Sequence, residues 1–237
     1  MRADIIIPTY GQTDHTLRCL QSIRKHSPHA RVVWVDDGST RASREAVLDE
    51  LQRMPDYRAV WTGGNKGLIK AVNTGLTLVN DIWKTESEYV VICNNDIEVT
   101  EGWLDRMIHV MERDEEIYAV GPVTSECKSW QSYLNAKQVT KGFQIPEGFA
   151  DMATSERATK LDYAYGDLYR RCLTLAFFCV VLRKEAFKQI GSLDESIGAA
   201  HGDEDYCKRL NNNGMKCALS WGTYVVKTTD IWKTESD

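Results

Sequence analysis

The 237-residue chain has no long hydrophobic run. Its longest, Leu173 to Leu182, is ten residues and contains a threonine, whereas a helix needs about 20 apolar residues to cross a bilayer. The opening stretch MRADIIIPTYG is too short for a signal peptide, because Pro8 and Gly11 interrupt it. We therefore expect no transmembrane segment and a cytoplasmic location.

Clustered basic residues and closely paired cysteines are also lacking. The net charge is -5, and the 29 lysines and arginines are scattered, so no basic patch of the kind that binds a nucleic-acid backbone is formed. The seven cysteines are odd in number and include no C-x-x-C pair, which is typical of reduced thiols in a reducing compartment. We expect no nucleic-acid partner, and the oligomeric state stays open.

The chain does contain a regular alternation of short β-branched runs with amphipathic helical patterns. The expected strands are ADIIIP, ARVVWV, YRAVW, EYVVIC and IYAVGPV, and helices are expected over 17–27, 40–51, 68–79 and 101–114. This order predicts an α/β fold with a mostly parallel central sheet and helices on both faces. A further strand is expected over 173–182 and helices near 183–191 and 201–214, whereas 124–172 has no clear period.

Polar residues follow four of these strands. They are Pro8-Thr9-Tyr10, Asp36-Asp37-Gly38-Ser39, the glycine-rich segment 63–67 and Asn94-Asn95-Asp96. Any one of these groups alone would be an ordinary turn. Because ligands of parallel α/β sheets bind beyond the carboxyl ends of the strands, the four together predict one crevice.

Several stretches resemble, in order and spacing, the family 2 glycosyltransferases. They are IIIPTYGQTDHTLRCLQSI, VVWVDDGST, GGNKGLIKAVNTGL, YVVICNNDIEV, FFCVVLRKEAFKQIGSLDES and GDEDYCKRL. Asn-Asn-Asp in place of the usual acidic motif is most similar to the rhamnosyltransferase-like branch. The resemblance implies one GT-A domain over 1–237, with a nucleotide-binding half (1–121) and an acceptor-binding and catalytic-base half (122–237).

The implied activity is inverting transfer of a sugar from a nucleoside diphosphate sugar, of UDP or dTDP type, to an acceptor hydroxyl. Asp37 is the candidate for the N3–H that uracil and thymine share, since a carboxylate accepts such a bond; it could instead cap the turn. The other candidate nucleotide contacts are Pro8, Thr9 and Tyr10 beside the base and Asn65, Lys66 and Gly67 in the family's N-x-G element. Lys66 could instead be a solvated loop charge, the commoner role of a lone lysine.

The leaving diphosphate needs its charge neutralised, usually by a divalent cation, here Mn²⁺ or Mg²⁺. Asp96 is the candidate metal ligand, and Asn94 and Asn95 could bind ribose or sugar hydroxyls. Many relatives carry a histidine after the last strand, where this chain has Lys227. Lys227 or His201 could contact the diphosphate directly, so the metal is either weakly held or less needed.

The stretch GDEDYCKRL places Asp203, Glu204 and Asp205 at a helix start. Asp203 shares the helix face of the apolar residues that follow, so it is the candidate general base, whereas Glu204 and Asp205 point elsewhere. The resemblance makes Asp205 the following acid, and Gly202 replaces a glutamate of the family motif. Simple N-terminal helix acids are the alternative.

The aromatic-rich segment between Ser125 and Tyr169 is the candidate acceptor side. Trp130 and Tyr133 could stack on a saccharide, lipid-linked or protein acceptor, or could simply pack on the sheet. Two other functions stay open: a catalytically impaired GT-A-like nucleotide-binding domain, and a nucleotidyltransferase, although PTYGQTD lacks the basic glycine-rich loop of the latter. The sequence DIWKTES occurs twice, at 81–87 and 230–236, and we have no physical explanation for it.

Overall fold

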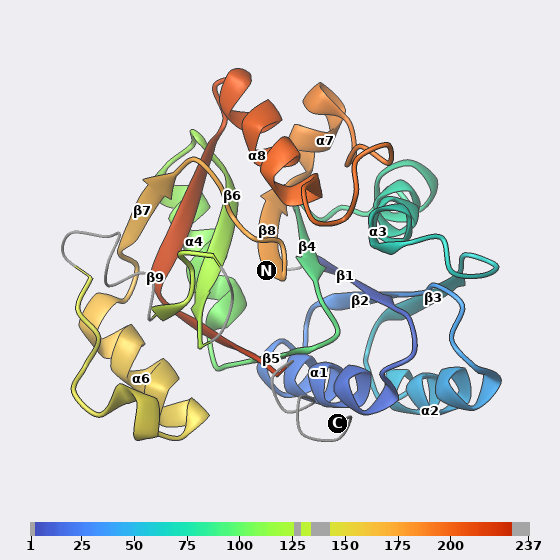
Figure 1. The fold of residues 1–237 in the computed structure, drawn as a ribbon, viewed down its shortest axis with the longest axis horizontal. Helices are drawn as coiled ribbons and strands as arrows, with labels where there is room; N and C mark the ends of the chain where they lie inside the picture. Colours follow the sequence, from blue (N-terminus) through green and yellow to red (C-terminus); the bar gives the residue numbers. More distant parts are fainter. Residues whose placement is uncertain (1–2, 126–128, 134–142, 229–237) are drawn as a thin grey trace.

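The computed structural model describes residues 3–125, 129–133 and 143–228, and its described part is built on a nine-stranded sheet (Figure 1). The strands are β1 (Ala3–Thr9), β2 (Arg31–Asp36), β3 (Tyr57–Trp61), β4 (Tyr89–Cys93), β5 (Ile97–Val99), β6 (Ile117–Thr124), β7 (Tyr169–Cys172), β8 (Cys179–Arg183) and β9 (Lys216–Lys227). The helices are α1 (Thr13–His26), α2 (Arg41–Leu51), α3 (Leu68–Thr77), α4 (Trp103–Arg113), α6 (Thr154–Tyr165), α7 (Lys184–Ile190) and α8 (Gly202–Asn212). A π-helical turn, η1 (Leu78–Ile82), extends α3, and η2 (Phe149–Asp151) is a 3-10 turn.

The strand order is β3-β2-β1-β4-β8-β6-β9-β5, with β7 paired to β9. The strands β3, β2, β1 and β4 pair in parallel, as β6 and β9 do, whereas β8, β5 and β7 join the sheet antiparallel. The register sets Thr9 level with Asp36 and Asp36 level with Trp61. The first three strands therefore end together at one edge of the sheet.

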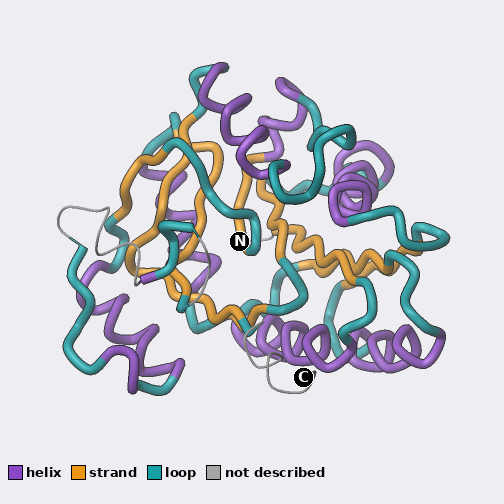
Figure 2. Tube along the Cα trace, viewed as in Figure 1, coloured by secondary structure: helices purple, strands orange, loops and turns teal. Residues whose placement is uncertain are grey.

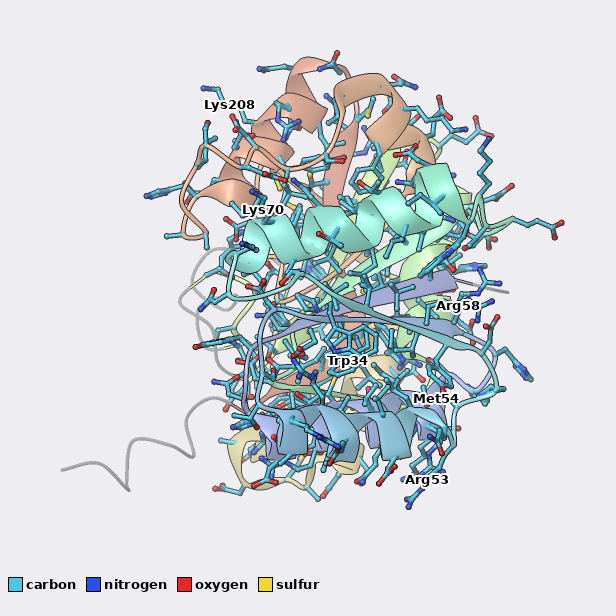
Figure 3. All side chains as sticks on the ribbon, turned by 90° about the vertical axis from the view of Figure 1, so that its right-hand side faces the viewer. Trp34, Arg53, Met54, Arg58, Lys70 and Lys208 are labelled. Atoms are coloured by element: carbon cyan, nitrogen blue, oxygen red, sulfur yellow. The ribbon has the colours of Figure 1, made fainter. Side chains whose placement is uncertain are left out.

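The apolar strands are buried because helices cover both faces of the sheet (Figure 2). Along β1, Ile5 and Ile7 pack in the cluster that contains residues of α1, α2 and α4, while Ile6 packs against α3 on the opposite face. Helix α3 comes very close to the sheet, since a Cβ at Gly75 would lie 2.5 Å from Ile6 Cγ2. Figure 3 shows Lys70 on α3 and Met54 after α2 on opposite sides of the strands.

The structure corrects the expected strand over 173–182, because β8 contains only Cys179–Arg183. Its partner β4 pairs through Cys93 with Cys179 and ends there, so residues 173–178 have no strand to bond. The segment expected to lack a period contains α6, whose weak pattern buries only Ala158 and Leu161. Among the described residues no helix combines the length and the hydropathy that crossing a bilayer requires.

The first copy of DIWKTES includes the end of η1 and the loop before β4. In it, the Thr85 hydroxyl donates to the buried Asp4 carboxylate, which also pairs with Lys184 at 2.6 Å. The copy at 230–236 lies outside the described residues. Of the seven cysteines, the six that the structure describes are free thiols, and Cys127 lies outside this range.

Candidate active site

The carboxylate of Asp37 joins the turn after β2 to the loop after β3. It is buried, and its Oδ1 accepts the Thr62 hydroxyl at 2.6 Å and the Lys66 backbone N–H at 2.9 Å. Its Oδ2 accepts the Gly67 backbone N–H at 2.8 Å. Asp37 therefore holds the N-x-G loop in place, a role that its local sequence did not indicate. The contact with a pyrimidine stays a prediction.

The same two segments approach each other closely at Gly38. A Cβ at this position would lie 2.7 Å from the backbone nitrogen of Asn65, and Gly38 has a φ of 103°, which disfavours side chains. Asn65, Lys66 and Gly67 are all exposed, and the Asn65 side chain accepts the Gly67 N–H at 3.2 Å. The loop thus presents these residues to solvent beside the edge of the sheet.

The three residues at the end of β1 differ in exposure. Pro8 and Thr9 are buried, and the Thr9 hydroxyl accepts Trp34 Nε1–H at 2.7 Å. The Thr9 carbonyl accepts the Asp37 backbone N–H at 2.8 Å, so this residue shapes the edge from within. Tyr10, by contrast, is 58% exposed. Its ring is therefore the part of Pro8-Thr9-Tyr10 that is accessible to a nucleobase.

The segment Asn94-Asn95-Asp96 leaves β4 and connects three parts of the fold. The Asn94 backbone N–H donates to the Phe178 carbonyl at 2.8 Å. Asn95 is buried, and its side-chain amide donates to the Thr16 hydroxyl on α1 at 3.0 Å. The amide of Asn95 therefore already has a structural partner.

Asp96 is paired with Lys227 at the end of β9. The distance from Lys227 Nζ to Asp96 Oδ2 is 2.6 Å, and the side chains are only 20% and 8% exposed, respectively. Asp96 Oδ1 is buried and has no hydrogen-bond partner among the described residues. The sequence placed both residues near the diphosphate but did not indicate that they touch.

The residues around Asp96 do not fit a tightly held divalent cation. Within the described ranges, no three or more His, Cys, Asp and Glu side chains gather as metal ligands would. Mg²⁺ can bind one carboxylate together with substrate phosphates, but the Asp96 carboxylate already binds an ammonium group. A cation on its other oxygen would lie close to that positive charge and be repelled.

Asp203 lies in the first turn of α8 and is half-buried. Burial raises the pKa of its carboxyl, and hydrogen bonds from the backbone N–H groups of Glu204 and Phe177 partly offset this effect. Phe177 and Phe178 therefore lie between two predicted site residues, since Phe178 binds the backbone of Asn94. This places the candidate base next to the segment that leaves β4.

The other two acids of the motif have different surroundings. Asp205 forms an ion pair with Arg209 at 2.8 Å, and Arg209 also donates to the carbonyls of Ile190 and Ser192. Glu204 is exposed, and its carboxylate lies 3.7 Å from the ring of the equally exposed His201. Arg209, paired with Asp205, thus fixes the chain before α8, and no described contact of Glu204 or His201 reaches the edge of the sheet.

One residue that sequence reasoning missed, Asn73, holds the loop before α8 against α3. Asn73 receives the Leu193 N–H at 3.1 Å and donates to the Leu193 carbonyl at 2.8 Å. A Cβ at Gly202 would lie 2.9 Å from Ile69 Cδ1, so the glycine that replaces the family's glutamate permits close packing of α8 on α3. The sequence contains one indication of this contact, because Asn73 is a polar residue within the apolar pattern of α3.

The two candidate acceptor residues lie in packed surroundings. Tyr133 is 7% exposed and meets Phe149 edge-on, with ring centroids 5.0 Å apart. Trp130 is partly buried against two hydrophobic clusters. These positions match the packing alternative, and an acceptor contact stays a prediction.

A mixed sheet between helices, with its polar loops gathered at one edge, is the GT-A fold, as comparison with solved structures confirms. The mannosyltransferase PcManGT from Pyrobaculum calidifontis, in complex with GDP-Man and Mn²⁺, superposes with a TM-score of 0.71 at 18% identity, covering 98% of this chain and 58% of that one. GalNAc-T7 with UDP, GalNAc and Mn²⁺ gives a TM-score of 0.66 at 15% identity, covering 96% and 44% of the two chains. The predicted fold class is therefore confirmed.

The profile of glycosyl transferase family 2 matches residues 4–191, and the chain belongs to this family. It is 23% identical over 228 residues to the O-antigen biosynthesis protein RfbC of Myxococcus xanthus, covering 95% of this chain and 17% of that protein. It is 25% identical over 224 residues to N-acetylglucosaminyl-diphospho-decaprenol L-rhamnosyltransferase of Mycobacterium tuberculosis, covering 89% of this chain and 70% of that protein. The resemblance to the rhamnosyltransferase-like branch is confirmed.

Proposed function

We propose that this chain transfers a sugar from a nucleoside diphosphate sugar to an acceptor hydroxyl, with inversion at the anomeric carbon. The proposal rests on the half-buried Asp203 carboxylate, which accepts a hydrogen bond from the Phe177 backbone N–H. The next residue, Phe178, binds Asn94 in the segment that follows β4. A carboxylate with a raised pKa is the better proton acceptor. A base beside the carboxyl edge of the sheet is the arrangement that this reaction needs.

In the proposed reaction, Asp203 takes the proton of the acceptor hydroxyl as its oxygen attacks the anomeric carbon. The bond from that carbon to the diphosphate breaks on the opposite face, and its electron pair leaves on the diphosphate oxygen. One displacement of this kind inverts the configuration. The Asp37-bound loop and the exposed ring of Tyr10 would hold the nucleotide while this happens.

The proposed donor is of UDP or dTDP type. Asp37, with Asn65 and the Gly67 backbone beside it, supports a pyrimidine, and the relative from Mycobacterium tuberculosis is named as an L-rhamnosyltransferase. That name also gives a lipid-linked saccharide as acceptor, and we propose an acceptor of this class here. The cytoplasmic location stays a prediction.

The predicted divalent cation is supported by the Mn²⁺ that accompanies both structural neighbours. When bound, such an ion would neutralise the leaving diphosphate, but Asp96, its predicted ligand, is already paired with Lys227 and does not fit a tightly held cation. Because Asp96 is paired with Lys227, the proposed steps rely only on the residues of the chain itself.

The alternative is a GT-A-like domain that binds a nucleotide without turnover. Release of nucleoside diphosphate from UDP-, dTDP- and ADP-sugars without acceptor distinguishes the two, measured with EDTA and with Mn²⁺. We expect release from a pyrimidine donor, since transferases slowly use water as acceptor. Binding of the diphosphates without any release would favour the binding domain.

A further inference from the structure

The carboxylate of Asp96, just after β4, is paired with the ammonium group of Lys227. Lys227 Nζ lies 2.6 Å from Asp96 Oδ2, and the lysine side chain is only 20% exposed. Surface lysines usually keep their ammonium groups in water. Lys227 is instead held against a buried carboxylate.

The backbone around Lys227 fixes this position. In the antiparallel pairing of β5 with β9, Lys227 is opposite Ile97, the residue after Asp96. Thr228 then binds the Asp96 carbonyl twice, through its N–H at 2.7 Å and its hydroxyl at 2.8 Å. Figure 1 shows the end of β9 running to β5 beside α1. The ammonium group is therefore positioned before any ligand binds.

We propose that the Lys227 ammonium neutralises the leaving diphosphate, so that donor binding and turnover need no divalent metal. The inference rests on the proposed function, which places the diphosphate at the edge where Asp96 follows β4. As the anomeric C–O bond breaks, its electron pair goes to the β-phosphate oxygen, to which Lys227 donates a hydrogen bond. Lys227 keeps its proton, because the acceptor proton goes to Asp203, and the charges balance.

In this arrangement Asp96 is a positioning residue for the lysine. The Asp96 carboxylate, 2.6 Å from Lys227 Nζ, limits the directions in which the ammonium group can point. The ammonium then acts as a built-in cation whose supply does not depend on the metal concentration. The substitution of the family's histidine by lysine therefore has a chemical consequence at the position where charge develops.

Calorimetric titration of UDP and dTDP, in EDTA and in Mn²⁺, tests the inference on the unmodified protein. For the diphosphate that binds more tightly, we expect the Kd in EDTA and the Kd in Mn²⁺ to differ by less than about threefold. A tenfold difference would correspond to about 1.4 kcal/mol of binding free energy. Binding that requires Mn²⁺ would overturn the inference and leave the proposed function intact. No binding in either condition would contradict the donor site itself, and the inference with it.

Variants of the same lysine sharpen the test. In EDTA, Lys227→Gln should raise the Kd by roughly tenfold or more, the size expected for a lost charge-assisted hydrogen bond. Lys227→Arg, which keeps the positive charge, should raise the Kd by less. Mn²⁺ should then restore binding to Lys227→Gln, because its Asp96 is free to hold the ion. Lys216→Gln, at the other end of β9, is the matched control and should bind as the unmodified protein does. Unchanged metal-free binding by Lys227→Gln, with an unchanged melting temperature, would also overturn the inference.

Discussion

The Asp37 carboxylate receives the backbone N–H of Gly67 at 2.8 Å, which connects the turn after β2 to the exposed loop after β3. This contact makes the shape of the candidate nucleotide site depend on one buried side chain. Loop geometry and nucleotide affinity should therefore change together when the carboxylate is removed.

We expect Asp37→Ala to weaken nucleoside diphosphate binding by roughly 1.5–3 kcal/mol, the range for hydrogen bonds to a charged group. Hydrogen exchange at the Lys66 and Gly67 amides should accelerate, because both amides lose their acceptor. Glu45→Ala, an exposed carboxylate paired with Arg41 on α2, serves as the control and should change neither quantity. Weaker binding with unchanged exchange would instead indicate that Asp37 contacts only the base.

Replacing the candidate base should separate catalysis from folding. Asp203→Asn keeps the shape of the side chain and an oxygen for the Glu204 N–H, but it cannot accept the acceptor proton. We expect turnover to fall by about 10²–10⁴-fold, with the diphosphate Kd unchanged. Asp105→Asn, in the first turn of α4, is the matched control and should retain activity. Full activity in Asp203→Asn would rule out this base.

The pH dependence of Asp203 has a definite sign. Its pKa is raised in the folded protein, so between the ordinary and the raised value the folded state binds more protons than the unfolded state. The contribution of Asp203 to stability is therefore present at low pH and is lost as the pH rises through this window. Relative to Asp203→Asn, the unmodified protein should lose stability over the same window, and its activity should fall as Asp203 becomes protonated in acid. Chemical unfolding at a series of pH values measures the first effect.

The exposed ring of Tyr10 should act on the nucleotide and not on the fold. With 58% of the residue exposed, Tyr10→Ala leaves the core intact. Loss of stacking on a base should weaken UDP or dTDP binding by roughly 1–3 kcal/mol, while Tyr10→Phe should bind almost normally. Equal affinities of the unmodified protein, Tyr10→Ala and Tyr10→Phe for the nucleotide would show that the Tyr10 ring does not contact the base.

Tyr133 should behave in the opposite way. Its ring is buried against Phe149, so Tyr133→Ala should reduce the free energy of unfolding by about 3–5 kcal/mol. Urea denaturation measures the loss. A raised acceptor KM with an unchanged melting temperature would support the acceptor role that the sequence suggested.

Local patterns predicted most of this architecture. The short apolar run of β1 and the Thr40 cap of α2, which accepts the Ser43 N–H at 3.2 Å, depend on neighbouring residues and can be read from the chain. The helical period also distinguished the half-buried Asp203 from the exposed Glu204.

Contacts between distant residues were not predictable. Lys227 and Asp96 are 131 positions apart, and their ion pair depends on how β9 pairs with β5. The length of β8 depends on where β4 ends, which no pattern within 173–182 reveals. A single sequence shows which residues carry the chemistry, whereas their partners are set by strand register.

Inverting transfer is tested most directly by proton NMR of the sugar first released from a pyrimidine nucleotide sugar, before mutarotation, with Asp203→Asn as the control. We expect the first sugar to have the anomeric configuration opposite to that of the donor, and the variant to release almost none. Release with retained configuration, or no release from any UDP- or dTDP-sugar with or without Mn²⁺, would contradict inverting transfer by this chain.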